Sequence, residues 1–63
     1  MTIWMIRSSF DANYFFDDTD AFGEAKWART RGKIFFTSEG AEDVAKELRS
    51  RAEACIVLQF TSK

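Results

Sequence analysis

The 63-residue chain has no histidine, no proline and a single cysteine, Cys55. One cysteine cannot form an internal disulfide, and without histidine a metal could be held only by carboxylates and one thiol. This composition excludes the common zinc sites, which use several Cys or His ligands. It also excludes a Ser or Cys nucleophile activated by histidine, the usual arrangement in covalent catalysis. Because Cys55 lies in an apolar segment, its thiol should be inert. We therefore expect no enzymatic activity and no cofactor.

Long apolar runs and an excess of one charge are missing as well. No segment approaches the roughly 20 apolar residues that span a bilayer, and the amino-terminal residues lack the basic lead of a signal peptide. The net charge of −1 predicts no general attraction to nucleic acid or to anionic membranes. A lone cysteine fits a reducing compartment, so we expect a cytoplasmic protein with no membrane partner.

Aromatic residues, in contrast, are abundant. Seven Phe, two Trp and one Tyr make up 16% of the chain. A chain this short forms one domain at most and buries only about 60% of its unfolded surface. Large aromatic side chains bury much area per residue and can offset the short length. We expect a single compact domain over residues 1–63.

Apolar, β-compatible segments predict strands at 2–7, 14–16, 33–37 and 55–60. Between the first two, Asp11-Ala12-Asn13 predicts the turn of a hairpin. The polar segment 17–24, which contains Gly23, is predicted as a loop. For 25–31 the pattern leaves a short helical turn and a strand both open.

The clearest element is a helix over about 39–52. Ser38 can serve as its N-cap, and acidic residues precede basic ones along it, as the helix dipole favours. Its apolar residues recur at helical spacing and form one stripe: Ala41, Val44, Ala45, Leu48 and Ala52. One helix can cover only one face of a small sheet. The pattern therefore predicts an α+β fold, with an antiparallel or mixed sheet of about three to four strands and one helix packed on one face.

Charge is arranged in two consecutive blocks of opposite sign. The acidic block is Asp11, Asp17, Asp18, Asp20 and Glu24, and the basic block is Lys26, Arg29, Arg31 and Lys33. A calcium loop starting at Asp18 fails at two ligand positions, where Phe22 and Arg29 stand. Two interpretations remain open: the blocks pair with each other, or the acidic residues bind a basic partner.

The basic block is interleaved with Trp27. Basic residues near aromatic ones are typical of platforms for single-stranded nucleic acid, and the candidate nucleic-acid-binding residues are Lys26, Arg29, Arg31 and Lys33. The glycine- and aromatic-rich strand of RNA-recognition sheets is absent, however. Strand alternation also places some aromatic residues on the sheet face away from the helix. An exposed apolar patch there would indicate a protein-binding or homodimer surface.

Three short motifs span most of the chain: Met5-Ile6-Arg7 in the first strand, Tyr14-Phe15-Phe16-Asp17 in the second, and the segment from Ile34 to Glu42 that leads into the helix. In this arrangement the chain resembles small phage- and prophage-encoded proteins of the order ββ-loop-βαβ, some of which inhibit host defence, as anti-CRISPR proteins do. The resemblance implies a mobile-element origin. It also implies an inhibitor that binds a host protein, such as a nucleic-acid-binding nuclease complex, by steric block or by acidic mimicry of nucleic acid.

The resemblance carries over no site residues, so the candidate partner-binding residues rest on charge and aromaticity alone. They are Asp17, Asp18, Asp20, Glu24, Tyr14, Phe16 and Trp27. The alternatives are a small single-stranded nucleic-acid-binding protein and a structural homodimer.

Overall fold

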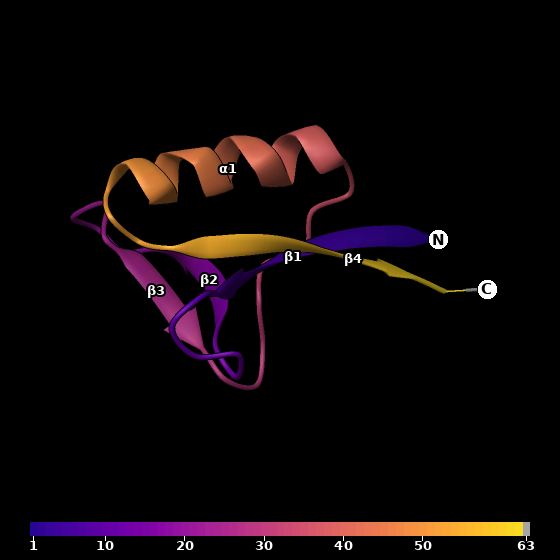
Figure 1. Ribbon diagram of the computed structural model, residues 1–63, viewed down its shortest axis with the longest axis horizontal. Helices are drawn as coiled ribbons and strands as arrows, with labels where there is room; N and C mark the ends of the chain where they lie inside the picture. Colours follow the sequence, from indigo (N-terminus) through magenta and orange to yellow (C-terminus); the bar gives the residue numbers. More distant parts are fainter. Residues whose placement is uncertain (63) are drawn as a thin grey trace.

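A four-stranded antiparallel sheet carries one helix on one of its faces (Figure 1). The computed structural model describes residues 1–62. Its elements follow one another as β1 (Thr2–Ser8), β2 (Phe15–Thr19), β3 (Ala25–Ala28), α1 (Ser38–Ser50) and β4 (Cys55–Thr61). The strand order in the sheet is β3-β2-β1-β4. The predicted α+β fold, with a small sheet and one helix, is confirmed.

The first and last strands form the longest pairing in the sheet. β1 and β4 are in register from Thr2 opposite Thr61 to Ser8 opposite Cys55. β1 meets β2 only near Arg7, so β2 and β3 diverge from the other two strands as a separate hairpin (Figure 1). The other end of the β1–β4 ribbon extends beyond the helix (Figure 1).

The core lies between α1 and the side of the sheet that faces it. Its buried residues are Ile6, Phe16, Phe35, Ala41, Ala45, Leu48 and Cys55. The small side chains of Ala41 and Ala45 let the helix approach the sheet closely, and Val44 packs at the border of the core. The predicted apolar stripe of the helix therefore holds from Ala41 to Leu48.

Both ends of the helix differ slightly from the prediction. Thr37, and not Ser38, is the N-cap, because its Oγ1 accepts a hydrogen bond from the Gly40 amide at 3.1 Å. Ala52 is exposed and lies outside the helix with a left-handed φ of 64°. This conformation, usually taken by glycine, turns later amides back toward the last helical carbonyls. Within residues 1–62, no helix is long and apolar enough to cross a membrane.

The acidic segment after Phe16 is more ordered than predicted. Residues 17–19 continue β2 instead of forming a loop, because Asp18 and Thr19 pair with Lys26 and Ala25 of β3. For segment 25–31, where the sequence left a helical turn and a strand both open, the structure shows a strand over Ala25–Ala28.

The strand predicted at 33–37 does not form, and this prediction is wrong. Phe35 forms an isolated bridge with Trp4 of β1 through two backbone hydrogen bonds of 2.9 Å, and the Lys33 amide donates to the Phe16 carbonyl of β2 at 2.8 Å. The flanking Ile34 and Phe36 are exposed. The connection to the helix is therefore held to the sheet by two residues of this segment, Lys33 and Phe35.

We expect Leu48→Ala to lower the free energy of unfolding by about 2–5 kcal/mol, because it leaves a cavity where a side chain only 3% exposed now packs. Urea denaturation followed by circular dichroism measures the change. Lys46→Ala, at an exposed position of the same helix, is the matched control and should alter stability by less than about 0.5 kcal/mol. Equal stability of the two variants would mean that Leu48 does not belong to the core.

Candidate functional site

The β2–β3 hairpin brings parts of the two charged blocks together, with Asp17 and Asp18 on β2 and Lys26 on β3. Asp18 of β2 stands directly across from Lys26 of β3. Just beyond β3, the Arg31 Nε lies 3.2 Å from the Asp17 Oδ2. The hairpin thus brings opposite charges together, as one of the two sequence interpretations expects. Part of the acidic block is therefore compensated within the chain and is less available to a basic partner.

Asp20 has a structural task in the turn between β2 and β3. Its Oδ1 accepts hydrogen bonds from the backbone amides of Phe22, at 2.8 Å, and Glu24, at 2.9 Å. Gly23, with a φ of 79°, provides the left-handed position that this tight turn requires. The Arg51 guanidinium donates to the Gly23 carbonyl and ties the turn to the end of the helix. Of the predicted acidic set, Asp18 and Glu24 are the most exposed.

The aromatic members of the predicted partner-binding set are mostly structural. Phe16 is only 3% exposed and packs edge-to-face against Trp27, with ring centroids 6.0 Å apart. Its assignment to the partner-binding surface is wrong, because strand alternation points its side chain toward the helix. Trp27 is half-buried, and its indole Nε1 donates to the Glu53 Oε1 at 3.3 Å. Tyr14 is half-buried beneath the Arg29 guanidinium.

Each residue of the basic block lies near an acidic or an aromatic side chain. Lys26 and Arg31 stand beside Asp18 and Asp17. The Arg29 guanidinium lies 5.7 Å from the ring centroid of Tyr14. The Lys33 Nζ lies 5.9 Å from the ring centroid of Phe35.

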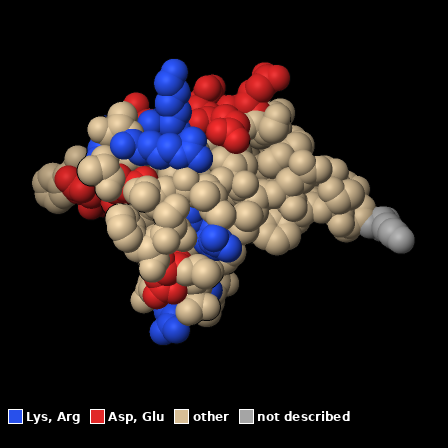
Figure 2. Space-filling model, in the orientation of Figure 1, with Lys and Arg blue, Asp and Glu red and all other residues tan. Residues whose placement is uncertain are grey.

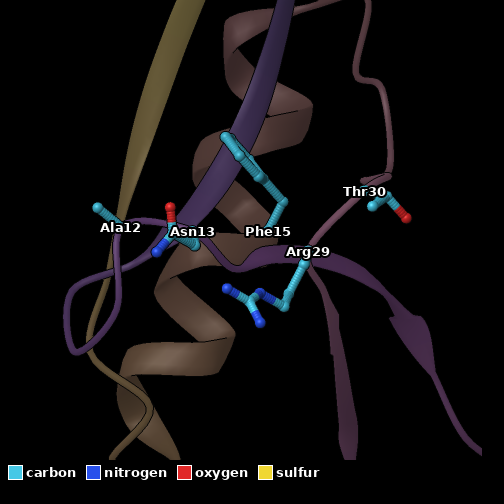
Figure 3. Close-up of a pocket in the computed structure, with 5 residues that line it drawn as sticks. All are labelled: Ala12, Asn13, Phe15, Arg29 and Thr30. Atoms are coloured by element: carbon cyan, nitrogen blue, oxygen red, sulfur yellow. The ribbon is translucent and has the colours of Figure 1, made fainter.

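Arg29 also borders a hollow in the surface (Figure 3). This open hollow, of about 530 Å³, is lined by Ala12, Asn13, Phe15, Arg29 and Thr30. Its polar groups are one guanidinium, one amide and one hydroxyl, with no carboxylate, thiol or imidazole among the lining side chains. The lining offers a cation and an amide donor, but no general base.

Cys55 is the one thiol of the chain, and it lies in the core beneath the helix. Its Sγ donates to the Ala45 carbonyl, 3.6 Å away. Burial raises the pKa of the Cys55 thiol, while the nearby Arg49 opposes this rise only in part. The neutral thiol is therefore favoured, which makes Cys55 a poor nucleophile. No three His, Cys, Asp or Glu side chains gather as a metal site within residues 1–62.

The face of the β1–β4 ribbon away from the helix is apolar except for Arg7, which stands opposite Ile56. Ile3 pairs with Phe60, and Met5 with Leu58, while Ile6 and Val57 alternate to the helix side. The apolar strand face consists of Ile3, Met5, Ile56, Leu58 and Phe60. Phe60 is 43% exposed, and the other four are half-buried. The helix does not cover this face, although the backbone at Gly32 approaches Met5 on it.

The apolar character continues to the projecting end of the ribbon. A second hollow of about 180 Å³ lies there, lined by Met1, Ile3, Phe60, Thr61 and Ser62. In Figure 2 the projecting end shows no acidic or basic side chain, whereas charged groups cluster over the helix and the hairpin. The partner-binding residues predicted from the sequence do not include Ile56, Leu58 or Phe60, although alternation within a strand at 55–60 places these three on one side.

Three phenylalanines outside the predicted site are also highly exposed, namely Phe10, Phe22 and Phe36. Phe22 projects from the turn that Asp20 and Gly23 hold, and it is 90% exposed. Sequence reasoning considered Phe22 only as a misfit in a calcium loop. Because Phe22 directly precedes Gly23 in a polar segment, the sequence could have indicated that its side chain is exposed.

Comparison with known proteins yields no relative. No family model matches the chain, and neither a curated protein nor a solved structure shows significant similarity to it.

The Cys55 thiol should resist alkylation in the folded protein, because it is buried and its raised pKa keeps it protonated at pH 8. Iodoacetamide labelling followed by mass spectrometry should show modification only as urea unfolds the chain. Since the unfolded thiol ionises first, stability should decrease as the pH rises above the ordinary thiol pKa. Cys55→Ala should remove that alkaline component. Rapid labelling without urea would contradict the inert role.

Asp20→Ala should destabilise the fold by about 1–2 kcal/mol, because two turn amides lose their carboxylate acceptor. Glu24→Ala in the same turn is the control, and its effect should stay within about 0.5 kcal/mol. The unfolding temperatures of the two variants, measured by thermal denaturation, test this expectation. If the two variants unfold at the same temperature, Asp20 has no structural task in the turn.

Proposed function

We propose that this chain is a non-enzymatic protein-binding module that contacts its partner through the apolar strand face. The observation that carries the proposal is the set of five uncharged side chains on the sheet face that α1 leaves uncovered. Cores of protein interfaces are depleted in charge and enriched in aromatic residues and Met, and this face combines Met5 and Phe60 with three aliphatic side chains. The buried, protonated state of Cys55 also argues against covalent catalysis.

A host nucleic-acid-binding defence complex is the partner that we propose to test first, in the host cytoplasm. The motivation is the resemblance to phage-encoded inhibitors in the motifs at Met5–Arg7, 14–17 and 34–42. Steric block by an apolar surface is the mechanism we favour over acidic mimicry. The reason is that Asp17 is paired with Arg31 and Asp20 is engaged in its own turn.

Binding of single-stranded nucleic acid is the second candidate. It is favoured by the exposed guanidinium of Arg29, which stacks on Tyr14 and borders a hollow (Figure 3). It is disfavoured by the acidic residues beside Lys26 and Arg31, because they reduce the positive potential that holds phosphates.

Affinity capture from host lysate with matched variants tests the proposal. Phe60→Glu places a charge on the apolar strand face and should reduce recovery of the partner at least about tenfold, because a buried charge at an interface is costly. Phe36→Glu, at an exposed phenylalanine outside that face, is the control and should leave recovery unchanged. Circular dichroism verifies that both variants fold.

Two further sets of variants test the acidic and the basic residues as alternative binding surfaces. Asp17→Asn, Asp18→Asn and Asp20→Asn combined remove the acidic charge while Asn keeps an oxygen acceptor for the turn. Arg29→Ala with Arg31→Ala removes half of the basic block. Loss of the partner with the Asn set but not with Phe60→Glu would favour acidic mimicry. A gel shift with single-stranded oligonucleotides that is lost on Arg29→Ala would favour nucleic-acid binding.

A further inference from the structure

The two edges of the sheet are very different. The edge strand β3 has only four residues, and Lys26 lies in its middle. The edge strand β4 has seven residues, Cys55–Thr61, with no charge and no proline, and it runs in unbroken register with β1. Natural sheets usually protect their edges with lysine, proline, bulges or short strands. β3 carries such protection and β4 does not.

The pairing with β1 shows which backbone amides and carbonyls of β4 point away from the sheet and form its open edge. Met1 and Ser62 exchange both of their backbone hydrogen bonds, at 3.1 and 2.9 Å. Because antiparallel pairs alternate between facing and outward-facing groups, Thr61, Gln59 and Val57 direct their amides and carbonyls away from β1. Independently, Trp4, which stands opposite Gln59, uses its own amide and carbonyl to bond Phe35.

The helix closes this edge at the other end of β4. The Cys55 carbonyl accepts a hydrogen bond from the Arg49 Nε at 3.1 Å. The open edge therefore consists of Val57, Gln59 and Thr61.

We propose that β4 pairs antiparallel with β4 of a second copy of this chain, about a two-fold axis at Gln59. In this register Gln59 of one copy faces Gln59 of the other, and Val57 faces Thr61. All three open residues then exchange backbone hydrogen bonds with a partner. A shift toward Cys55 needs a carbonyl that Arg49 already occupies, and a shift toward the C-terminus leaves Val57 without a strand residue opposite.

The side chains of β4 are complementary to themselves in this register. On the helix side, the two Gln59 amides can donate to and accept from each other, and β-branched Val57 lies beside Thr61. On the opposite side Leu58 faces Phe60, so the apolar strand faces of the two copies become one continuous surface. No like charges meet, because β4 carries none. The inference concerns an edge and not that face, so it does not depend on the proposed function.

Charge-swapped variants at Gln59, which is exposed in the single chain, test the pairing. The native chain should show a reversible monomer–dimer equilibrium in sedimentation from low to high micromolar concentration. Gln59→Lys and Gln59→Glu should each weaken the dimer about three- to tenfold, because like charges then stand opposite. An equimolar mixture of the two variants should restore it. Asn13→Lys and Asn13→Glu, in an exposed loop outside the strands, are the controls and should not respond to mixing.

Several outcomes would overturn the inference. A chain that stays monomeric over the whole range has no such interface. A dimer that Phe60→Glu dissociates and Gln59→Lys leaves intact would be a face-to-face pair of sheets. If Gln59→Lys and Gln59→Glu each weaken the dimer but their mixture does not restore it, the register at Gln59 is excluded. Because Gln59→Lys leaves the apolar strand face unchanged, its capture of a host partner reports separately on the proposed function.

Discussion

The pairing of β1 with β4 is the interaction on which the rest of the structure depends. It joins the two ends of the chain, from Thr2 opposite Thr61 to Ser8 opposite Cys55. The helix that precedes β4 is thereby held over one face of this ribbon, where Ile6 and Leu48 are buried. A single helix of 13 residues cannot cover the second face as well. The uncovered apolar residues follow from this constraint.

The β2–β3 hairpin accounts for the unusual distribution of charge. Two blocks of opposite sign, consecutive in sequence, fold back on each other, so that Asp17 meets Arg31 and Asp18 meets Lys26. Such exposed pairs contribute little stability individually. Their effect is to reduce the field that either block would present to a charged partner. The β1–β4 ribbon carries only one charged side chain, Arg7, on its strands.

Face and edge of that ribbon have complementary uses. The apolar strand face offers buried area, whereas the open edge of β4 offers directional backbone hydrogen bonds at Val57, Gln59 and Thr61. Pairing of the two β4 edges would double the width of the apolar strand face, measured across the strands. It would leave the face uncovered, since neighbouring antiparallel strands share the same two sheet sides. A small chain would in this way obtain an interaction surface larger than its own size allows.

The sequence by itself determined the elements whose signal is local and periodic. The stripe from Ala41 to Leu48 predicted the helix and its buried side, and the apolar, β-compatible segment 55–60 predicted the last strand. Only the tertiary structure decided which apolar or polar segment finds a strand partner. The segment 33–37 looks like a strand, yet only Phe35 reaches a free position on β1, whereas the polar residues 17–19 form part of a strand because β3 lies beside them. Pairing and burial depend on contacts between residues distant in sequence, and no local pattern contains that information.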